Sequence, residues 1–327
     1  MLSRINADEK QTFFGKTLQN SCMIDSKLKV LQMVAQHGTV TAAAEALHYT
    51  PSAVSYQVRQ LAEELGVELL APSGRGIALT AAARVVLRHA EALYAEAERA
   101  YAELAATADE PTGLFTLCGF STAASRLLPP AASDLRNRFP QITLRVIEAE
   151  PVRCFDLLLS GDADLALVTN TAETPPAGDE RFDQKPLLDD PLDLVVPEGH
   201  RLTRLSRVDL ADAADEPWIV GSPGTTYHHL VMNACMAAGF TPNIAHQADE
   251  WETGTALVAH GFGIILVPKL ARLKDWPVVR LPLSGGPAPV RRVLAATRKG
   301  KRDHPLVTAA LERISSSSTL PVVRDGT

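Results

Sequence analysis

Four hydroxyl groups and one guanidinium lie close together in the N-terminal part of the chain. They belong to Thr50, Ser52, Ser55, Tyr56 and Arg59. On a helix, the last four share one stripe, opposite a stripe of apolar residues. A hydroxyl can bond a phosphate or a base edge, and a guanidinium suits a guanine edge or a phosphate. The chemistry that this stripe offers is recognition of a nucleic acid duplex.

The helix that must carry this stripe has clear start and stop signals. Thr50-Pro51 combines a hydroxyl N-cap with proline at the first helical position, and Gly66 ends the helix. The side chains expected to face inward are Val54, Val58, Leu61 and Leu65.

Two shorter helices precede it. Ser26 is expected to cap the first, which stops at His37-Gly38, and Thr39 is expected to cap the second. With the polar turn at 48–50, this arrangement satisfies the needs of a helix-turn-helix, which reads base edges near the N-terminus of its second helix. An ordinary three-helix packing unit with a solvated polar stripe is the alternative that the pattern leaves open. The predicted DNA contacts are Thr41, Thr50, Pro51, Ser52, Ser55, Tyr56, Arg59 and Arg75.

A hairpin and a long helix follow. Residues 69–79 predict two short strands around a glycine turn, and Thr80 begins an alanine-rich helix of about 42 Å that reaches Ala108. Its apolar residues recur at alternating spacings of four and three, an a/d seam formed by Val86, Ala90, Leu93, Ala97, Ala100 and Leu104. Because the seam is longer than a small domain can cover, we expect it to pair with a second chain. Packing on its own domain is the alternative.

From Asp109 to Gly113 the sequence breaks the helix and marks a domain boundary. Beyond it, short apolar runs alternate with helical segments, which is typical of βαβ units and parallel sheets. Strands are expected at Leu114–Phe120, Ile142–Glu148, Leu165–Thr169, Leu192–Pro197, Trp218–Gly221, Ile244–Ala248, Gly263–Pro268 and Val290–Thr297, and helices at about 123–138, 151–160, 227–238, 250–260 and 304–314. We expect residues 1–22 and the tail at 315–327 to be disordered, and Met23 to be a candidate start of translation.

Composition narrows the class of protein. The chain has 327 residues and a net charge of −6, which argues against a protein that coats nucleic acid non-specifically. Residues 23–90 carry six basic and five acidic side chains, so DNA reading there must rest on geometry more than on charge. The four cysteines form no C-x-x-C pair, which favours reduced thiols in a cytoplasmic protein over a disulfide frame or a zinc site. No apolar run approaches the roughly 18 residues of a membrane span, and the first residues contain no secretory signal.

The segment GTVTAAAEALHYTPSAVSYQVRQLAEELGVELL, followed by GRGIALT, resembles the N-terminal module of LysR-type transcriptional regulators. The resemblance extends from about Met23 to Ile314. It implies an α/β fold class with an N-terminal winged helix-turn-helix, a long linker helix and a two-lobed, periplasmic-binding-protein-like effector domain. The domains that it implies are residues 23–80 for the winged helix-turn-helix, 81–110 for the linker helix used in dimerisation, and 113–314 for the effector domain. Lobe one of that domain would comprise 113–187 and 283–314, and lobe two 188–282.

The sequence departs from the family pattern at three places. Glutamine-proline usually lies inside the recognition helix, where this chain has Pro51-Ser52 one position earlier. The wing usually carries an arginine where Pro72 lies, and a proline-glycine pair near the linker is replaced by Ala81 and Ala83. Fewer basic residues in the wing imply fewer phosphate contacts, and hence weaker and less salt-sensitive binding by each subunit.

The resemblance implies an effector site between the lobes, where strand ends meet helix starts. The predicted contacts are Ser121, Thr122, Ala123, Thr169 and Asn170 from lobe one, and Ser222, Gly224 and Thr225 from lobe two. Ser121, Thr122 and Thr225 have an alternative role as helix N-caps. Glu148 and Glu150 are either cleft carboxylates that would favour an amine or solvated loop charges. Many family members bind small carboxylates or amino acids, but the sequence does not name this effector.

These observations predict a cytoplasmic, sequence-specific transcriptional regulator whose activity is modulated by a small-molecule effector. Its expected partners are an interrupted palindromic operator in double-stranded DNA, the effector, and copies of itself in a homodimer or homotetramer, with RNA polymerase as a further candidate. A small-molecule-binding protein or enzyme built on the two-lobed domain is the alternative. The chain contains no G-x-S-x-G, H-E-x-x-H, phosphate loop or complete G-x-G-x-x-G, so no catalytic residue, metal or cofactor is predicted. A redox sensor is disfavoured because Cys118 lies within an expected strand.

Overall fold

The computed structural model describes residues 24–73, 76–108, 110–171, 173–284 and 288–317. They form two compact units, one comprising the described residues up to Lys185 and from Leu294 onward, the other Pro186–Val293. The strands β6 (Phe182–Pro197) and β11 (Val290–Arg298) carry the chain across the two boundaries. The return to the first unit thus comes at Leu294, eleven residues after the expected position near Leu283. Among the described residues, no helix is both long enough and apolar enough to cross a membrane.

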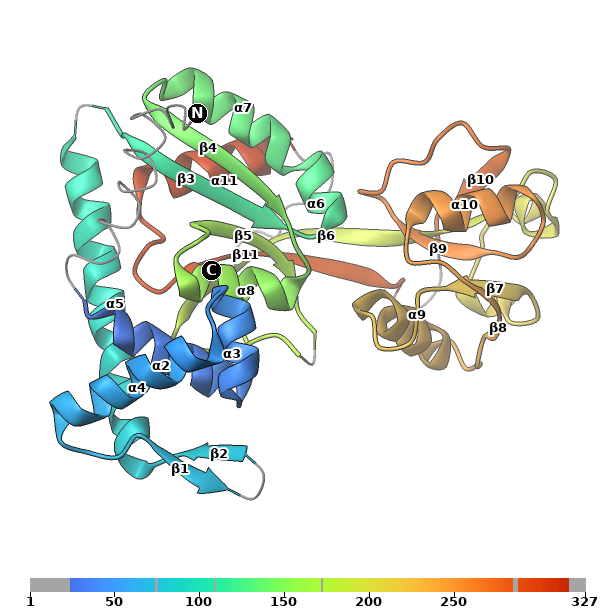
Figure 1. The fold of residues 1–327 in the computed structure, drawn as a ribbon. Coiled ribbons are helices and arrows are strands. Elements are labelled where there is room, and N and C mark those ends of the chain that lie inside the picture. Colours follow the sequence, from blue (N-terminus) through green and yellow to red (C-terminus); the bar gives the residue numbers. More distant parts are fainter. Residues whose placement is uncertain (1–23, 74–75, 109, 172, 285–287, 318–327) are drawn as a thin grey trace, which may run out of the picture. The chain divides into compact units, whose positions relative to one another are not determined.

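The first unit begins with three helices, α2 (Ser26–His37), α3 (Val40–Leu47) and α4 (Pro51–Leu65) (Figure 1). The expected cap of the first helix is wrong by one position. Asp25 is the N-cap and accepts a hydrogen bond from the backbone of Lys27, whereas Ser26 is the first helical residue.

Hydroxyl caps begin the other two helices as predicted. The side chain of Thr39 accepts from the backbone N–H of Ala42, and that of Thr50 from Ala53. Each of these bonds satisfies an amide that has no partner within the helix. Gly66 ends α4 in the left-handed conformation, as its position in the sequence predicts.

The core of this three-helix module contains most of the predicted inward positions. Val54, Val58 and Leu61 of α4 are buried, but Leu65 is 47% exposed, which contradicts the prediction that it faces inward. Leu65 is the last residue of its helix, and it is outside the apolar cluster that Val54, Val58 and Leu61 form with residues of α2 and α3. A hairpin of β1 (Leu70–Ser73) and β2 (Gly76–Leu79) follows, with Leu70 paired to Leu79.

The long helix α5 (Ala81–Thr107) starts at the predicted N-cap, Thr80. One of its faces packs within the first unit and buries Tyr94, Ala95, Glu98 and Ala102. Packing on its own unit therefore accounts for this face. The a/d seam predicted from the sequence lies partly in the core of the unit and partly at its surface. Ala90 is buried, whereas Leu93 and Leu104 are 55% and 58% exposed.

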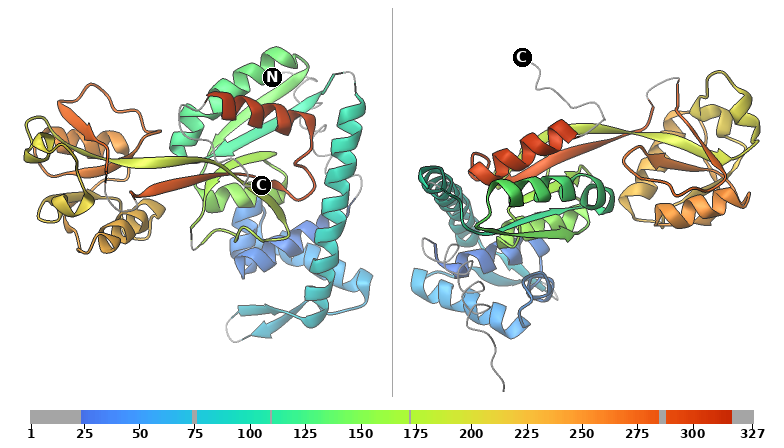
Figure 2. Two further views of the ribbon diagram at one scale, coloured as in Figure 1. Left: turned by 180° about the vertical axis from the view of Figure 1, so that it is seen from behind. Right: turned by 90° about the horizontal axis from the view of Figure 1, so that it is seen from above.

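The remainder of the first unit is an α/β lobe, called lobe one below. Its strands are β3 (Gly113–Gly119), β4 (Ile142–Glu148) and β5 (Leu165–Thr169), in the order β4-β3-β5-β11, with β3 parallel to both neighbours. The helices α7 (Leu128–Arg138) and α11 (Pro305–Ser317) lie side by side on one face, and α8 (Pro151–Ser160) lies on the other (Figure 2). The helix expected at 123–138 is in fact two, because α6 (Ser121–Arg126) ends before a new helix whose first turn contains Pro129 and Pro130. Proline is tolerated in a first turn but not in a helix interior.

The second unit is built on β6, with β9 (Ile265–Pro268) and β10 (Val278–Leu281) paired to it in antiparallel fashion. A parallel pair, β7 (Pro217–Val220) and β8 (Asn243–Gln247), is accompanied by α9 (Thr226–Ala237) and α10 (Trp251–Ala259). Two short 3-10 helices lie at Arg201–Arg204 and Leu210–Ala213. Trp218 is fully buried at the centre of this unit, and its indole N–H donates to the carbonyl of Ala213.

Gly300 of lobe one lies directly against the backbone of α5. Its φ is +87°, and a Cβ there would overlap the carbonyl oxygen of Ala95. We expect Gly300→Ala to lower the free energy of unfolding by more than the about 1–3 kcal/mol that a positive φ alone costs, because the backbone of α5 would also have to move. Urea unfolding of both proteins measures the difference. Gly239→Ala is the matched control, since Gly239 has a φ of +89° and open space around it. Equal losses in the two variants would contradict close packing of α5 on Gly300.

Candidate nucleic-acid interface and ligand site

The exposed stripe of α4 contains three of the eight side chains predicted to contact DNA. Ser52, Tyr56 and Arg59 are exposed, and Tyr56 retains 57% of its accessible surface. The Tyr56 hydroxyl accepts a hydrogen bond from the side chain of Gln60, one turn further along, at 2.8 Å. This contact holds the phenol ring along the helix surface, where its edge and hydroxyl remain available.

The start of α4 is held by two hydroxyls. The Thr50 hydroxyl accepts from the backbone N–H of Ala53 at 3.2 Å and lies 3.0 Å from the hydroxyl of Ser52. Thr50 therefore has a structural role as the helix cap. Pro51 is exposed at the first helical position and has no N–H to offer a phosphate.

The other predicted DNA contacts lie in different surroundings. Ser55 is half-buried on α4, and Thr41 is exposed in the first turn of α3. Arg75 lies outside the described residues. The structure also adds a residue that the sequence reasoning treated only as part of a turn: Tyr49, directly before the cap of α4, is 49% exposed. An aromatic side chain in the turn of a helix-turn-helix was the signal available for it.

Charge near α4 is largely neutralised. The ammonium of Lys27 lies 2.8 Å from Glu64 and 3.0 Å from Asp25, and its hydrogen bonds to Glu64 and Asp25 raise its pKa. Arg84 donates to the carbonyl of Leu79 at the end of the hairpin. Arg59 is therefore the cation on the exposed stripe itself.

The predicted ligand contacts of lobe one meet at one edge of its sheet. Because β3 and β5 are parallel, with Gly119 opposite Leu167, the segments at Ser121 and Thr169 leave the sheet at the same edge. Thr122, Ala123 and Thr169 are buried there, Ser121 is half-buried and Asn170 is exposed. The N-cap of α6 is Phe120, with no side-chain cap, so Ser121 and Thr122 do not serve as N-caps.

Glu148 and Glu150 lie at the neighbouring strand end and are exposed. Glu150 is the N-cap residue of α8 but makes no side-chain cap bond.

In the second unit the predicted contacts take part in local structure. Thr225 caps α9, accepting from the backbone of His228 at 3.1 Å, and its hydroxyl donates to the carbonyl of Ser222. The N–H and hydroxyl of Ser222 both donate to the carboxylate of Asp249 at 2.7 Å, and these two bonds lower the pKa of Asp249. Gly224 has a φ of +87° with open space around it. Asp249, exposed after β8, was not found by sequence reasoning, which had no pattern joining it to Ser222.

The thiols of the described residues are all buried. Cys118, Cys154 and Cys235 are 0% exposed, and Cys22 lies outside the described residues. A hydrogen bond to Cys154 and burial raise the pKa of Cys118, and burial raises the pKa of Cys235 to about 12. Cys118 and Cys235 are therefore poor thiolates at neutral pH. No cluster of three or more histidine, cysteine, aspartate or glutamate side chains suited to a metal ion occurs in the part of the chain that the structure describes.

Comparisons with known proteins agree with this arrangement. Residues 26–84 match the bacterial regulatory helix-turn-helix family of the lysR type, and residues 108–318 match the LysR substrate binding domain. The chain is 30% identical over 278 residues to the DNA-binding transcriptional dual regulator OxyR of Escherichia coli (strain K12), covering 84% of this chain and 88% of that protein. It is 29% identical over 232 residues to the HTH-type transcriptional regulator AlsR of Bacillus subtilis (strain 168), covering 70% and 75%.

Solved structures share the fold. A full-length OxyR variant from Pseudomonas aeruginosa superposes with a TM-score of 0.64 at 23% identity, covering 93% of this chain and 99% of that one. The LysR family transcriptional regulator CbnR superposes with a TM-score of 0.52 at 23% identity, covering 89% and 100%.

Proposed function

This chain belongs to the LysR family of DNA-binding transcriptional regulators, and we propose that it reads its operator with Ser52, Tyr56 and Arg59 of α4. The observation that carries this proposal is the exposed polar stripe directly after a capped helix start. The N-terminal residues of a recognition helix are those that reach base edges in the major groove. Arg59 is suited to a guanine edge or a phosphate, and the hydroxyls to either.

The operator in this proposal is an interrupted palindrome bound by a homodimer or homotetramer in the cytoplasm. Leu93 and Leu104 of α5 support this, since two large apolar side chains more than half exposed on one long helix favour pairing with a second copy. Two paired subunits would place two recognition helices in successive major grooves. RNA polymerase is the further partner that such a regulator would contact.

The effector in this proposal is a small molecule held at the sheet edge of lobe one by Ser121, Thr122, Thr169 and Asn170, and Ser222 and Thr225 of the second unit stay predictions from the sequence. The convergence of two parallel strand ends supports the site in lobe one. In the second unit the support is weaker for Thr225, whose hydroxyl is already used as a cap. A small carboxylate or an amino acid is the proposed chemical class.

Several relatives carry the name hydrogen peroxide-inducible genes activator. We do not extend peroxide sensing to this chain. A peroxide-reactive cysteine needs an accessible thiolate, whereas Cys118 and Cys235 are buried with raised pKa values.

Removal of the Arg59 guanidinium should weaken specific DNA binding. We expect Arg59→Ala to cost about 1–3 kcal/mol of operator affinity, enough to abolish retention in a gel shift run near the dissociation constant. The measurement uses DNA from upstream of the gene and a scrambled duplex of the same composition. Arg136→Ala, an exposed arginine on α7, is the matched control. Undiminished binding by Arg59→Ala would remove this residue from the contact set.

The effector site can be tested with the double variant Ser121→Ala, Thr122→Ala. A panel of small carboxylates and amino acids is first screened against the full-length protein by thermal shift. We expect a compound that stabilises the native protein to bind the double variant at least about tenfold more weakly, because a hydrogen bond to a charged group contributes about 1.5–3 kcal/mol. Ser125→Ala, which removes a hydroxyl that faces the carbonyl of Thr122, serves as the control. Normal binding by the double variant would refute this placement of the site.

The buried thiols give a third expectation. In a Cys22→Ser background, we expect Cys118, Cys154 and Cys235 to react with a thiol reagent only after denaturation, because all three are buried and the raised pKa values of Cys118 and Cys235 also disfavour their thiolates. Hydrogen peroxide should then leave operator binding unchanged. The denatured protein, in which three thiols react, is the control. Rapid labelling of the native protein, or a peroxide-dependent change in affinity, would show that a thiol is accessible after all.

A further inference from the structure

The helix-turn-helix and lobe one share a continuous apolar core. The same cluster of buried side chains contains Leu31 of α2 and Val54 of α4 together with Phe155 and Leu158 of α8. The helix α8 is buried on nearly every side, because it lies between the sheet of lobe one and α2 (Figure 1). A helix that is apolar around most of its circumference is one that has protein on both sides.

Three arginines of lobe one cross this boundary to acceptors in the helix-turn-helix. Arg181 donates to the side chain of Gln36 at 2.5 Å, and Arg298 donates to that of Gln32 at 3.2 Å. Arg153 donates to the backbone carbonyl of Ala46 at 3.0 Å, and its other terminal nitrogen lies 3.2 Å from Nε2 of His48. Each acceptor lies more than 100 positions away in the sequence.

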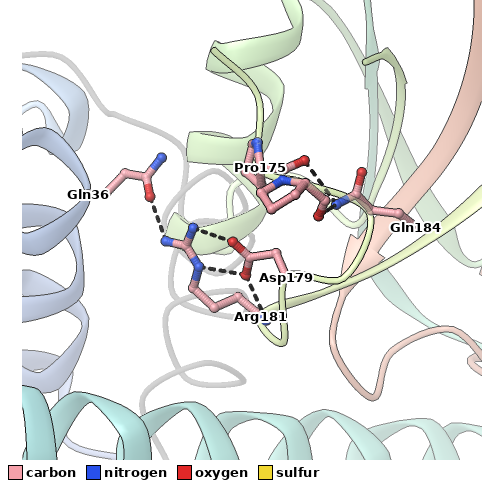
Figure 3. Close-up of polar contacts among 6 residues, drawn as sticks. Gln36, Pro175, Asp179, Arg181 and Gln184 are labelled. Carbon is pink, nitrogen blue, oxygen red and sulfur yellow. Dashed lines mark hydrogen bonds and ion pairs between the residues drawn. The ribbon is translucent and has the colours of Figure 1, made fainter. Parts of the chain in front are cut away.

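Arg181 is aimed at the helix-turn-helix by its own neighbour. Asp179 accepts from Nε at 2.9 Å and from Nη2 at 2.7 Å, which fixes the plane of the guanidinium and directs Nη1 at Gln36 (Figure 3). The side chain of Gln184 donates to the carbonyls of Pro175 and Pro176 and so holds the loop that presents Asp179. Such a bidentate pair is geometrically specific as well as strong.

Arg298 lies in a buried site formed by residues of lobe one, of the helix α5 and of the helix-turn-helix. Its side chain donates to the carbonyl of Leu159 at 2.8 Å, and its guanidinium lies 3.8 Å from the ring centroid of Tyr94 on α5. The residue is 5% exposed, and burial lowers its pKa. Since a buried charge needs every hydrogen bond it can make, the bond to Gln32 favours the docked position of α2.

Arg153 contacts the turn that precedes the recognition helix. Ala46 lies in the last turn of α3, where carbonyls lack partners within the helix and carry partial negative charge. His48 follows with a φ of 55°, a left-handed conformation that is strained for a residue with a Cβ. Thr50, the cap of α4, comes two residues later. A guanidinium that binds both Ala46 and His48 therefore constrains the path of the chain into α4.

Arg153 is also close to the ligand edge of lobe one. It lies in the first turn of α8, which begins at Pro151, separated by two residues from the end of β4 at Glu148. That strand end is level with Gly119 of β3, two residues before Ser121. The stripe at Ser52, Tyr56 and Arg59 remains exposed in the docked arrangement. Docking therefore orients the recognition helix and does not cover it.

We propose that Arg153, Arg181 and Arg298 dock the helix-turn-helix on lobe one of the same chain, and that Arg153 is a positioning residue that sets the turn ahead of the recognition helix. A shift of the strand ends that carry the proposed effector site would then be transmitted to α4, the DNA-reading helix, through Arg153 in the first turn of α8. This last step rests on the effector site proposed above, whereas the docking itself does not.

The test uses the full-length protein without DNA or ligand. Amide hydrogen exchange is compared for native protein, Arg153→Ala, Arg153→Lys and the control Arg136→Ala. We expect exchange of residues 44–52 to rise about tenfold in Arg153→Ala, because a hydrogen bond from a charged donor is lost, and to rise less in Arg153→Lys, which keeps the charge and one contact. The Arg136→Ala control should match the native protein. Unchanged exchange in Arg153→Ala would overturn the docking role of this residue.

The positioning role is tested by a double-mutant cycle with His48→Asn, since asparagine tolerates the left-handed conformation. Operator affinity should fall about tenfold in Arg153→Ala, and by no more than that in the double variant, because both changes break the same contact. Additive losses, or raised exchange without any loss of affinity, would overturn the positioning role. Failure of the native protein to discriminate its operator would instead contradict the proposed function, and the exchange result would still decide the docking.

Discussion

Two cations at the end of β11 connect the long helix α5 to lobe one. Lys301 lies 2.9 Å from Asp164 and 3.2 Å from Glu98 of α5, and the second oxygen of Asp164 accepts from the backbone of Thr116 on β3 at 2.6 Å. Although burial opposes the charge on Lys301, the two carboxylates raise its pKa above the usual value. Removing one member of such a network leaves an uncompensated buried charge, which is strongly destabilising. With Arg298 against Tyr94, these contacts fix one face of α5 on the lobe, and the orientation of the helices before it depends on that face.

This constraint changes the interpretation of the seam on α5. A helix with apolar residues at a and d positions was expected to pair along its length with a second copy. A neighbouring face is occupied by its own unit, through Tyr94, Ala95, Glu98 and Ala102, whereas Ala90 alone of the six seam residues is buried. Leu93 and Leu104 lie on the part of the helix surface that remains exposed. A second copy of α5 would therefore pack against an apolar stripe that is narrower than the full a/d seam. The buried face of α5 would set the direction in which this stripe faces.

Local signals in the sequence were sufficient for the elements that carry the candidate DNA contacts. Thr50-Pro51 and Gly66 bound α4 because caps and proline act within a few residues. Local signals did not predict the structure where contacts between residues far apart in the sequence determine it. The strand β6 was predicted only from Leu192, because Pro186, Asp189 and Asp190 resemble a turn. Asp190 is instead fully buried against Arg291, 101 residues away. Arg153, Arg181 and Arg298 were not singled out for the same reason, since nothing near them in sequence reveals an acceptor on α2 or α3.

The helix-turn-helix carries little net charge. This is consistent with an orientation that is set by its contacts with lobe one. Lys27 is paired with Glu64 and Asp25, and residues 23–90 carry six basic and five acidic side chains, so their net attraction to phosphates is weak. A small DNA-binding module that makes few phosphate contacts gains more affinity from being held rigidly. Its segments are then ordered before it binds, so binding costs less conformational entropy. The continuous core from α2 to α8 supplies that rigidity without using the exposed stripe of α4. A chain with a more basic wing could tolerate a loosely tethered helix-turn-helix, whereas this one compensates for few charges with a docked one.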